Sequence, residues 1–302
     1  MRTIEHRVFL CGCPRSGTTL LQALLASHPD LTSLPETRFV ASTVGWHHRW
    51  PHALSRRTLP WFLVARARGW LRLSGSTRYP LYRRVLTELG YGDLAERAVS
   101  ALPRSQGTQI RLMVDALDRM ALARGRRGWI EKSNENVFYV PVIERYVPDA
   151  SFVHVLRDGR ENVASLHELP SRYPAERWGA GARWCERYRD VDNCIRDWGD
   201  YARAIRRLAG RANHVVVDYE ELVERPEDVL RDVVSAVGLE YSPRMLETYR
   251  DTAAALRTPD EPWKESVSGP WGRDGTKFER LFDEEAQAAI LRRVRSLEAE
   301  CC

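Results

Sequence analysis

The sequence predicts an α/β fold in which a mostly parallel sheet is covered by helices on both faces. Short apolar runs alternate along the chain with segments of helical periodicity. Two polar loops, 11–19 and 157–162, directly follow such runs, and ligands of parallel sheets bind at the carboxyl ends of the strands. The 302 residues, 43% of them hydrophobic, are sufficient for a substantial core.

The N-terminal segment is predicted to form a strand, a loop and a helix. Val8 to Leu10 is a short apolar run, and a stretch of Gly, Pro and Ser interrupts it. Four leucines then recur at helical spacing, and these are Leu20, Leu21, Leu24 and Leu25. The pair Pro29 and Asp30 ends this helix.

Residues 41–128 are less regular and are rich in Arg and Trp. The tryptophans are Trp46, Trp50, Trp61 and Trp70. We interpret this region as a mainly helical insertion that covers one face of the core, inside a single domain spanning residues 1–302. Core packing explains its tryptophans as well as a binding role does.

The remainder of the chain continues the alternation. Strands are predicted at 129–132, 152–156 and 215–218. A core-facing helix is indicated by apolar residues at spacings of three and four, which are Trp184, Tyr188, Val191, Ile195, Trp198, Ala202 and Ile205. A further helix begins near Pro226 and stops at Gly238, which suits a C-terminal cap.

Charge and cysteine content limit the classes of partner. The net charge of +5 favours anionic ligands, but Lys and Arg are spread along the chain, so no nucleic-acid partner is expected. The six cysteines have neither zinc-site spacing nor a disulfide framework, which favours reduced thiols in a cytoplasmic protein. We expect no signal peptide and no membrane span, because no stretch approaches the roughly 20 apolar residues required. The oligomeric state is open.

The first polar loop, CGCPRSGTTL, is suited to an anion. Gly12 and Gly17 have the spacing of a Walker A motif, but Thr18 stands where that motif requires Lys. Glycines let successive backbone N–H groups turn toward one anion, and the following helix adds its positive end. Ser16, Thr18 and Thr19 add hydroxyl groups, and Arg15 is the nearby cation. Without the Lys, transfer of a γ-phosphoryl group is disfavoured, whereas binding of a shorter phosphate chain is not.

The second polar loop follows the strand 152–156. Arg157 at the strand end is placed to hold a second phosphate bidentately, and Ser165 lies eight residues on, inside the helix that we predict next. The alternative is an ordinary surface ion pair between Arg157 and Asp158.

Together these motifs resemble the sulfotransferases that use 3′-phosphoadenosine 5′-phosphosulfate (PAPS). The stretch PRSGTTLLQALLASHP resembles the family's 5′-phosphosulfate loop, and VLRDGRENVAS resembles its 3′-phosphate motif. PETRFV at 35–40 and WIEKSNENV at 129–137 are similar to segments of the protein-tyrosine sulfotransferase branch. VVVDYEELVERPEDVLRDVVSAVGL resembles the C-terminal half of bacterial and Golgi members. The resemblance covers residues 8–40 and 129–240 and implies a fold related to the P-loop kinases.

The resemblance also implies roles for the matched residues. The 5′-phosphosulfate is expected on Arg15, Ser16, Gly17, Thr18 and Thr19, and the 3′-phosphate on Arg157 and Ser165. Tyr219 is expected to contact the adenine or its phosphate. Glu36 corresponds to the general base of the tyrosine-sulfating branch, and Lys132 and Arg15 are expected to neutralise charge on the sulfuryl group. No metal is expected, since no polyphosphate must be bridged.

Several assignments stay open at the level of sequence. Glu36 also suits a surface ion pair with Arg38, and many members use a histidine as base, for which the candidates are His28, His47, His48 and His52. The segment 263–278 departs from the family's glycine-rich tail, so it is either a cover over the nucleotide, through Lys264, Ser266 or Arg273, or a surface loop.

The leading hypothesis is a bacterial, PAPS-dependent enzyme that sulfates a hydroxyl or amine of a small-molecule or peptide acceptor. The insertion 41–128 would then shape the acceptor pocket. One alternative is a P-loop kinase with residues 215–218 as its Walker B strand, and another is a nucleotide-binding protein without catalysis. The acceptor itself is not readable from the sequence.

Overall fold

The computed structural model describes residues 3–44, 80–100, 105–174, 179–258, 261, 264 and 277–299. The chain divides into two compact units. Unit 1 consists of Met1–Phe9 and Asp30–Ala150, and unit 2 consists of Leu10–Pro29 and Ser151–Cys302.

Five strands form one sheet with the order β2-β3-β1-β4-β5. The strands are β1 (His6–Gly12), β2 (Leu31–Ser33), β3 (Gly128–Lys132), β4 (Ala150–Leu156) and β5 (His214–Asp218). β2 runs parallel to β3, and β4 runs parallel to β5. The predicted parallel α/β fold is confirmed, with its four predicted strands in place. β2 was missed, because three residues are too few to show a period of two.

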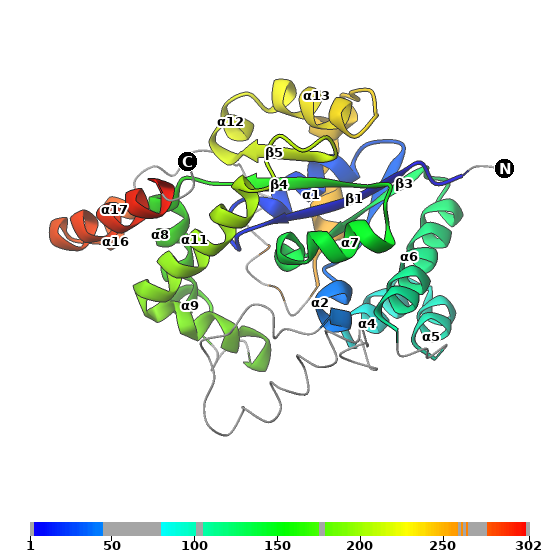
Figure 1. Ribbon diagram of the computed structural model, residues 1–302, viewed down its shortest axis with the longest axis horizontal. Helices are drawn as coiled ribbons and strands as arrows, with labels where there is room; N and C mark the ends of the chain where they lie inside the picture. The colour runs from blue at the N-terminus through cyan, green and yellow to red at the C-terminus, as the bar shows by residue number, and fades with distance from the viewer. Residues whose placement is uncertain are drawn as a thin grey trace. The chain divides into compact units, whose positions relative to one another are not determined.

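In unit 1 the helices surround an aromatic core. The helices are α2 (Phe39–Val44), α4 (Pro80–Glu88), α5 (Gly92–Ser100), α6 (Gln106–Ala123), the 3-10 helix η2 (Asn134–Tyr139) and α7 (Val140–Tyr146). α6 packs against α5, α2 and β3, and α4 packs against α5 (Figure 1). Phe9 meets Trp129 edge-on at 5.4 Å between ring centroids, and the Trp129 indole donates a 2.7 Å hydrogen bond to Asp118.

The predicted insertion 41–128 falls partly within these helices. Its residues 45–79 and 101–104, with all four of its tryptophans, lie outside the described residues. The described remainder is mainly helical. The assignment of a single domain with this insertion therefore stays a prediction.

In unit 2 the helices form separate groups around β4 and β5. They are α1 (Thr18–Ala26), α8 (Gly159–His167), α9 (Leu169–Arg172), the 3-10 helix η3 (Gly179–Arg189), α11 (Val191–Arg206), α12 (Tyr219–Glu224), α13 (Pro226–Ala236), α14 (Arg244–Glu247), α15 (Tyr249–Ala255), α16 (Lys277–Leu281) and α17 (Glu284–Ala299). α1 packs against α14 and α15, whereas α8 packs against α11, α16 and α17. α12 and α13 lie beside β5 (Figure 1).

The predicted helix through residues 184–205 is wrong at its N-terminal end. Trp184 and Tyr188 belong to η3, and α11 begins only after Asp190. Asp190 is extended (φ −87°, ψ 114°), and its carboxylate accepts a 2.9 Å hydrogen bond from the N–H of Asp192. This N-cap starts a new helix. The core-facing interpretation holds for the later apolar positions in α11, since Ile195, Trp198, Ala202 and Ile205 are buried, whereas Val191 is half-buried.

The predicted end of the later helix at Gly238 is confirmed. α13 ends at Ala236, and Gly238 adopts φ +79°. The N–H of Leu239 donates to the Val234 carbonyl at 2.8 Å, which closes the last turn. Among the residues that the structure describes, every helix is too short or too polar to cross a bilayer.

A chain of buried polar groups runs through the strands of unit 2. His154 Nε2 lies 2.8 Å from His214 Nδ1, and His154 Nδ1 lies 3.1 Å from Cys11 Sγ. Burial, together with the neighbouring His214, lowers the pKa of His154 to about 3. Folded His154 is therefore neutral across the range in which a histidine of the unfolded chain takes up a proton.

We expect acid to destabilise the protein through His154. The unfolded chain binds a proton on this residue below about pH 6.5 and the folded chain does not, so the free energy of unfolding falls as pH falls. Between pH 7 and pH 5 the loss from this group is about 2 kcal/mol. In His154→Phe that part of the dependence disappears in urea titrations at the two pH values. An unchanged dependence would contradict the assignment.

Candidate functional site

The loop between β1 and α1 curls by means of two residues with positive φ. Arg15 has φ +71° and Gly17 has φ +98°. Glycine adopts this conformation freely, whereas a non-glycine residue held there is strained, as is typical of functional loops. The N–H of Ser16 donates to the Cys13 carbonyl at 3.0 Å, and α1 begins at Thr18. The buried Ser16 hydroxyl has no hydrogen-bond partner within the described part of the chain. The loop thus has a helix N-terminus and an available hydroxyl, which suit an anion.

The structure brings the second predicted motif against this loop. Arg157 Nη1 donates to the Arg15 carbonyl at 3.0 Å, and Arg15 Nε donates to Ser165 Oγ at 3.4 Å. Asn162, which the sequence motifs did not indicate, donates from Nδ2 to the Pro14 carbonyl at 3.3 Å. Asn162 precedes Ser165 by three residues on α8, so the two side chains lie on the same face of the helix. Helical spacing from Ser165 is therefore the signal by which Asn162 could have been found.

Tyr219 closes the same group of residues. It is the first residue of α12, and the guanidinium of Arg157 lies 4.7 Å from its ring centroid. A Cβ placed on Gly17 would overlap this ring. Arg15, Gly17, Arg157, Ser165 and Tyr219 are thus gathered within unit 2.

Two carboxylates missed by the sequence reasoning flank Arg157. Glu161 and Glu220 approach its guanidinium at 3.8 and 3.9 Å, and burial raises the pKa of both. The alternative surface pair of Arg157 with Asp158 is wrong. Asp158 instead accepts the N–H of Glu161 as the N-cap of α8 and pairs with Arg160 at 3.3 Å.

Gly17 offers a test of the loop's packing. We expect Gly17→Ala to destabilise the protein by about 2–4 kcal/mol, because it adds backbone strain of roughly 1 kcal/mol and forces the methyl group against Tyr219. Gly210→Ala is the matched control: Gly210 has φ +80° but open space around its Cα, so only the strain applies. Urea unfolding measures both. Equal losses in the two variants would show that Tyr219 does not restrict the loop.

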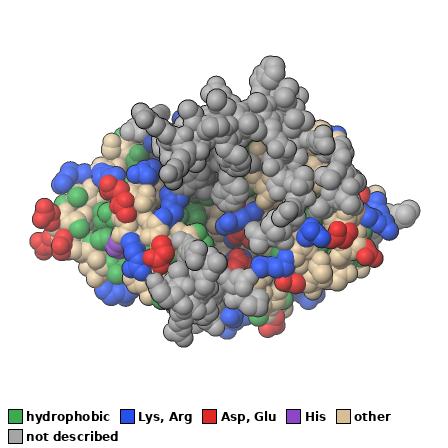
Figure 2. Space-filling model, turned by 90° about the horizontal axis from the view of Figure 1, so that it is seen from below, with side chains coloured by type: hydrophobic (Ala, Val, Ile, Leu, Met, Phe, Trp, Pro, Cys, Tyr) green, Lys and Arg blue, Asp and Glu red, His purple; other side chains and the backbone are tan. Residues whose placement is uncertain are grey.

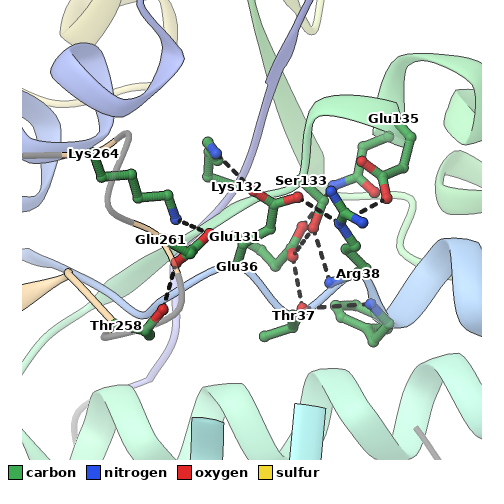
Figure 3. A network of polar contacts seen from close by, with 12 residues as sticks. Glu36, Thr37, Arg38, Glu131, Lys132, Ser133, Glu135, Thr258, Glu261 and Lys264 are labelled. Atoms are coloured by element: carbon green, nitrogen blue, oxygen red, sulfur yellow. Dashed lines mark hydrogen bonds and ion pairs between the residues drawn. The ribbon is translucent and has the colours of Figure 1, made fainter. Parts of the chain in front are cut away.

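Unit 1 holds a compact network that contains the other predicted residues. Lys132 at the end of β3 and Glu36 in the loop before α2 are both buried, and Lys132 Nζ donates to Glu36 Oε2 at 2.8 Å (Figure 3). Arg38 Nε donates to Glu36 Oε1 at 2.8 Å and lies 3.3 Å from Glu135 Oε1. The expected pair of Glu36 with Arg38 exists, but it is part of a buried network in which Lys132 takes the other oxygen. A carboxylate next to an ammonium can accept a proton while the ammonium stabilises negative charge.

The network continues to a further buried carboxylate, Glu131, which no sequence motif indicated. Its side chain accepts hydrogen bonds from Thr37 Oγ1 at 2.7 Å, Ser133 Oγ at 2.6 Å and Asn136 Nδ2 at 2.5 Å. Burial raises the pKa of Glu131, against the effect of these three donors. Glu131 is adjacent in sequence to Lys132 but sits on the opposite side of the strand, where alternation predicts a packing residue.

The remaining candidates are placed as follows. His28 is buried in unit 2, with Nε2 2.8 Å from the Glu240 carbonyl. Lys264 is buried and pairs with Glu261 at 2.7 Å (Figure 3). Several candidates lie outside the described residues, and these are His47, His48, His52, Ser266, Arg273 and most of the segment 263–278. Asp218 caps α12 by accepting the N–H of Glu221 at 2.9 Å.

Comparisons with known proteins agree on one family. A model described as "Sulfotransferase family" matches residues 7–243. The chain is 23% identical over 282 residues to protein-tyrosine sulfotransferase 2 of Gallus gallus, which covers 92% of this chain and 59% of the relative. It is 28% identical over 249 residues to the nodulation protein NoeE of Sinorhizobium fredii, which covers 78% of this chain and 50% of that protein. The chain thus spans little more than half the length of these relatives.

Solved structures share the fold. The sulfotransferase domain of the Synechococcus PCC 7002 olefin synthase superposes with a TM-score of 0.57 at 18% identity, covering 99% of this chain and 96% of that one. A mouse sulfotransferase solved as a complex with PAP has a TM-score of 0.50 at 13% identity, covering 98% and 84%.

Proposed function

Because this chain belongs to the sulfotransferase family, we propose that it moves a sulfuryl group from PAPS to a hydroxyl or amine of a small-molecule or peptide acceptor. The observation that carries the proposal is the contact between the two anion motifs in unit 2. Arg157 donates to the carbonyl of Arg15 at 3.0 Å, and Arg15 donates to Ser165 at 3.4 Å. A donor with phosphates at its 5′ and 3′ positions matches two such motifs in one unit.

The donor is assigned to this group of residues. The loop from Arg15 to Thr19, at the N-terminus of α1, would hold the 5′-phosphosulfate through backbone N–H groups and hydroxyls. Arg157 and Ser165 would hold the 3′-phosphate, because guanidinium groups bind phosphate bidentately. Tyr219, already stacked on Arg157, would contact the adenine or this phosphate. PAPS binding requires Arg157 to exchange its contacts with Glu161 and Glu220 for the phosphate.

Transfer is proposed as an in-line displacement. The acceptor oxygen or nitrogen forms a bond to sulfur while the bond from sulfur to the bridging oxygen breaks. The electron pair stays on the 5′-phosphate, which leaves as adenosine 3′,5′-bisphosphate. Glu36 takes the acceptor proton, and Lys132 and Arg15 stabilise the negative charge that develops on the transferred group and the leaving oxygen. We assign the base to Glu36 rather than to His28, because Glu36 is already paired with Lys132.

The acceptor is proposed to be a small molecule or a peptide. One relative is named as a protein-tyrosine sulfotransferase, which supports a peptide or phenolic hydroxyl as the acceptor. We assign the acceptor pocket to the insertion 41–128, within a single domain 1–302. Whether the enzyme sulfates an oxygen or a nitrogen depends on which of these atoms the acceptor presents.

We propose that the protein has no nucleic-acid partner. On the described surface in Figure 2, Lys and Arg side chains lie interspersed with Asp and Glu, which disfavours a nucleic-acid partner. Transfer is proposed to need no metal. Among the described residues, no group of three or more His, Cys, Asp or Glu is arranged to hold one. We propose a bacterial, cytoplasmic enzyme, in keeping with the reduced state of Cys11, Cys13, Cys185 and Cys194.

One experiment separates this function from a kinase or a non-catalytic nucleotide-binding protein. Thermal stabilisation by adenosine 3′,5′-bisphosphate is compared with that by ATP plus Mg²⁺, and we expect the bisphosphate to stabilise more strongly. Stronger stabilisation by ATP plus Mg²⁺ would refute the proposal. Transfer of radiolabelled sulfate from PAPS to a panel of phenols, sugars, lipids and peptides then identifies the acceptor. Asp218 disfavours the kinase, because its carboxylate caps α12.

A further inference from the structure

The buried carboxylate of Glu131 connects three segments of unit 1 (Figure 3). Only 1% of the residue is exposed, and its two oxygens accept hydrogen bonds from three side chains. Thr37 belongs to the loop before α2, Ser133 follows β3, and Asn136 lies in η2. A buried carboxylate is costly to desolvate, and replacing such a group together with its hydrogen-bond partners by apolar side chains is often neutral for stability. Stability alone therefore gives little reason for Glu131.

The bonds of Glu131 lead to the two residues assigned to catalysis. Thr37 directly follows Glu36, and Ser133 directly follows Lys132. Ser133 Oγ donates to Glu131 Oε1 at 2.6 Å and also accepts the N–H of Arg38 at 3.0 Å. Glu131 thus fixes the backbone next to Glu36 and next to Lys132 through one carboxylate.

The conformation of Arg38 shows that this backbone is held under strain. Arg38 has φ +52°, which costs a non-glycine residue roughly 1–2 kcal/mol. The bond from its N–H to Ser133 stabilises that conformation, in which the guanidinium reaches Glu36 at 2.8 Å and Glu135 at 3.3 Å. Strain retained at a site is commonly used to orient a functional group.

We propose that Glu131 is a positioning residue that holds the Glu36 carboxylate at hydrogen-bonding distance from the Lys132 ammonium. The inference rests on the proposed function, since it assigns Glu131 a part in the same transfer. A displacement of about 1 Å in a catalytic group can reduce the rate about 100-fold. The bonds that fix the position of Glu36 relative to Lys132 therefore affect turnover rather than donor binding.

The test removes single bonds from Glu131, because removal of the carboxylate would leave three buried donors unpaired and endanger folding. Thr37→Val breaks the bond between Glu131 and the residue next to Glu36, together with the 3.4 Å bond that Thr37 Oγ1 accepts from the N–H of Phe39. Asn136→Leu breaks a bond to the same carboxylate from a residue that is not adjacent in sequence to Glu36 or Lys132, and is the matched control. Thr37→Ser retains the hydroxyl. For each variant, kcat with PAPS and the best acceptor of the panel, the Kd of adenosine 3′,5′-bisphosphate and Tm are measured.

We expect Thr37→Val to lower kcat at least 10-fold with the Kd of the bisphosphate unchanged. Asn136→Leu should lose similar thermal stability and keep kcat within about twofold, and Thr37→Ser should restore turnover. If the two bond-breaking variants lose kcat in proportion to Tm, or if Thr37→Val turns over like the wild type, the positioning role is overturned and the proposed function stands. A wild-type protein that binds the bisphosphate but sulfates no acceptor overturns both.

Discussion

Replacing Lys132 by Met is expected to lower kcat about 100- to 1,000-fold while leaving the Kd of adenosine 3′,5′-bisphosphate unchanged. The reason is that the ammonium of Lys132 would act on charge that develops only during transfer, and removal of one such donor typically costs this much. Methionine keeps the length and the apolar stem of the side chain. Arg38 remains 2.8 Å from Glu36, so the carboxylate does not lose all positive charge. Steady-state kinetics with PAPS and calorimetric titration with the bisphosphate give the two quantities.

Lys277→Met is the control for this change. Lys277 Nζ pairs with Glu168 at 2.7 Å, nearly the same as the 2.8 Å of Lys132 with Glu36, and it is also largely buried. The same substitution breaks a comparable ion pair at the start of α16, and neither residue of this pair is assigned to transfer. We expect Lys277→Met to change Tm at most and to leave kcat near the wild-type value. Equal losses of kcat in the two variants would remove Lys132 from the transfer step.

Replacing Arg157 by Ala is expected to weaken binding of adenosine 3′,5′-bisphosphate about 100-fold. Charge-assisted bonds to a phosphate contribute roughly 1.5–3 kcal/mol, which converts to about 10- to 150-fold for one bond. Arg157 is held ready for this role by the Arg15 carbonyl and the Tyr219 ring. Adenosine 5′-phosphate lacks the 3′-phosphate, so its affinity should change little. Titration calorimetry with both nucleotides measures the difference.

Arg160→Ala controls for the loss of one positive charge in the same motif. Arg160 is 47% exposed at its side chain and pairs with Asp158 at 3.3 Å. Its removal should reduce affinity for both nucleotides slightly and equally, as expected of a screened surface charge. If Arg157→Ala weakened both nucleotides equally, Arg157 would act on the loop or on the 5′ side, and the assignment to the 3′-phosphate would fail.

Much of the fold and half of the candidate site were predictable from the sequence. The strand at 152–156, the helix carrying Ser165 and the cap at Gly238 follow from apolar runs, helical spacing and glycine, which are local properties. The curled loop ahead of α1 was also predictable, since such a loop depends on residues adjacent in the chain. The prediction of one helix through residues 184–205 failed at Asp190. The helical spacing of apolar residues continues across this N-cap, so the spacing does not show that one helix ends and another begins there.

The tertiary structure alone decided how the chemically important groups pair. Glu36 meets Lys132 across 96 positions of sequence, and Arg157 reaches Arg15 across 142. Such contacts depend on strand order and on the direction of each side chain, which no local pattern contains. The same holds for the left-handed Arg38 and for the three bonds that bury Glu131. The sequence determined which chemistry the chain carries, and packing between distant segments decided which of its charges are held together.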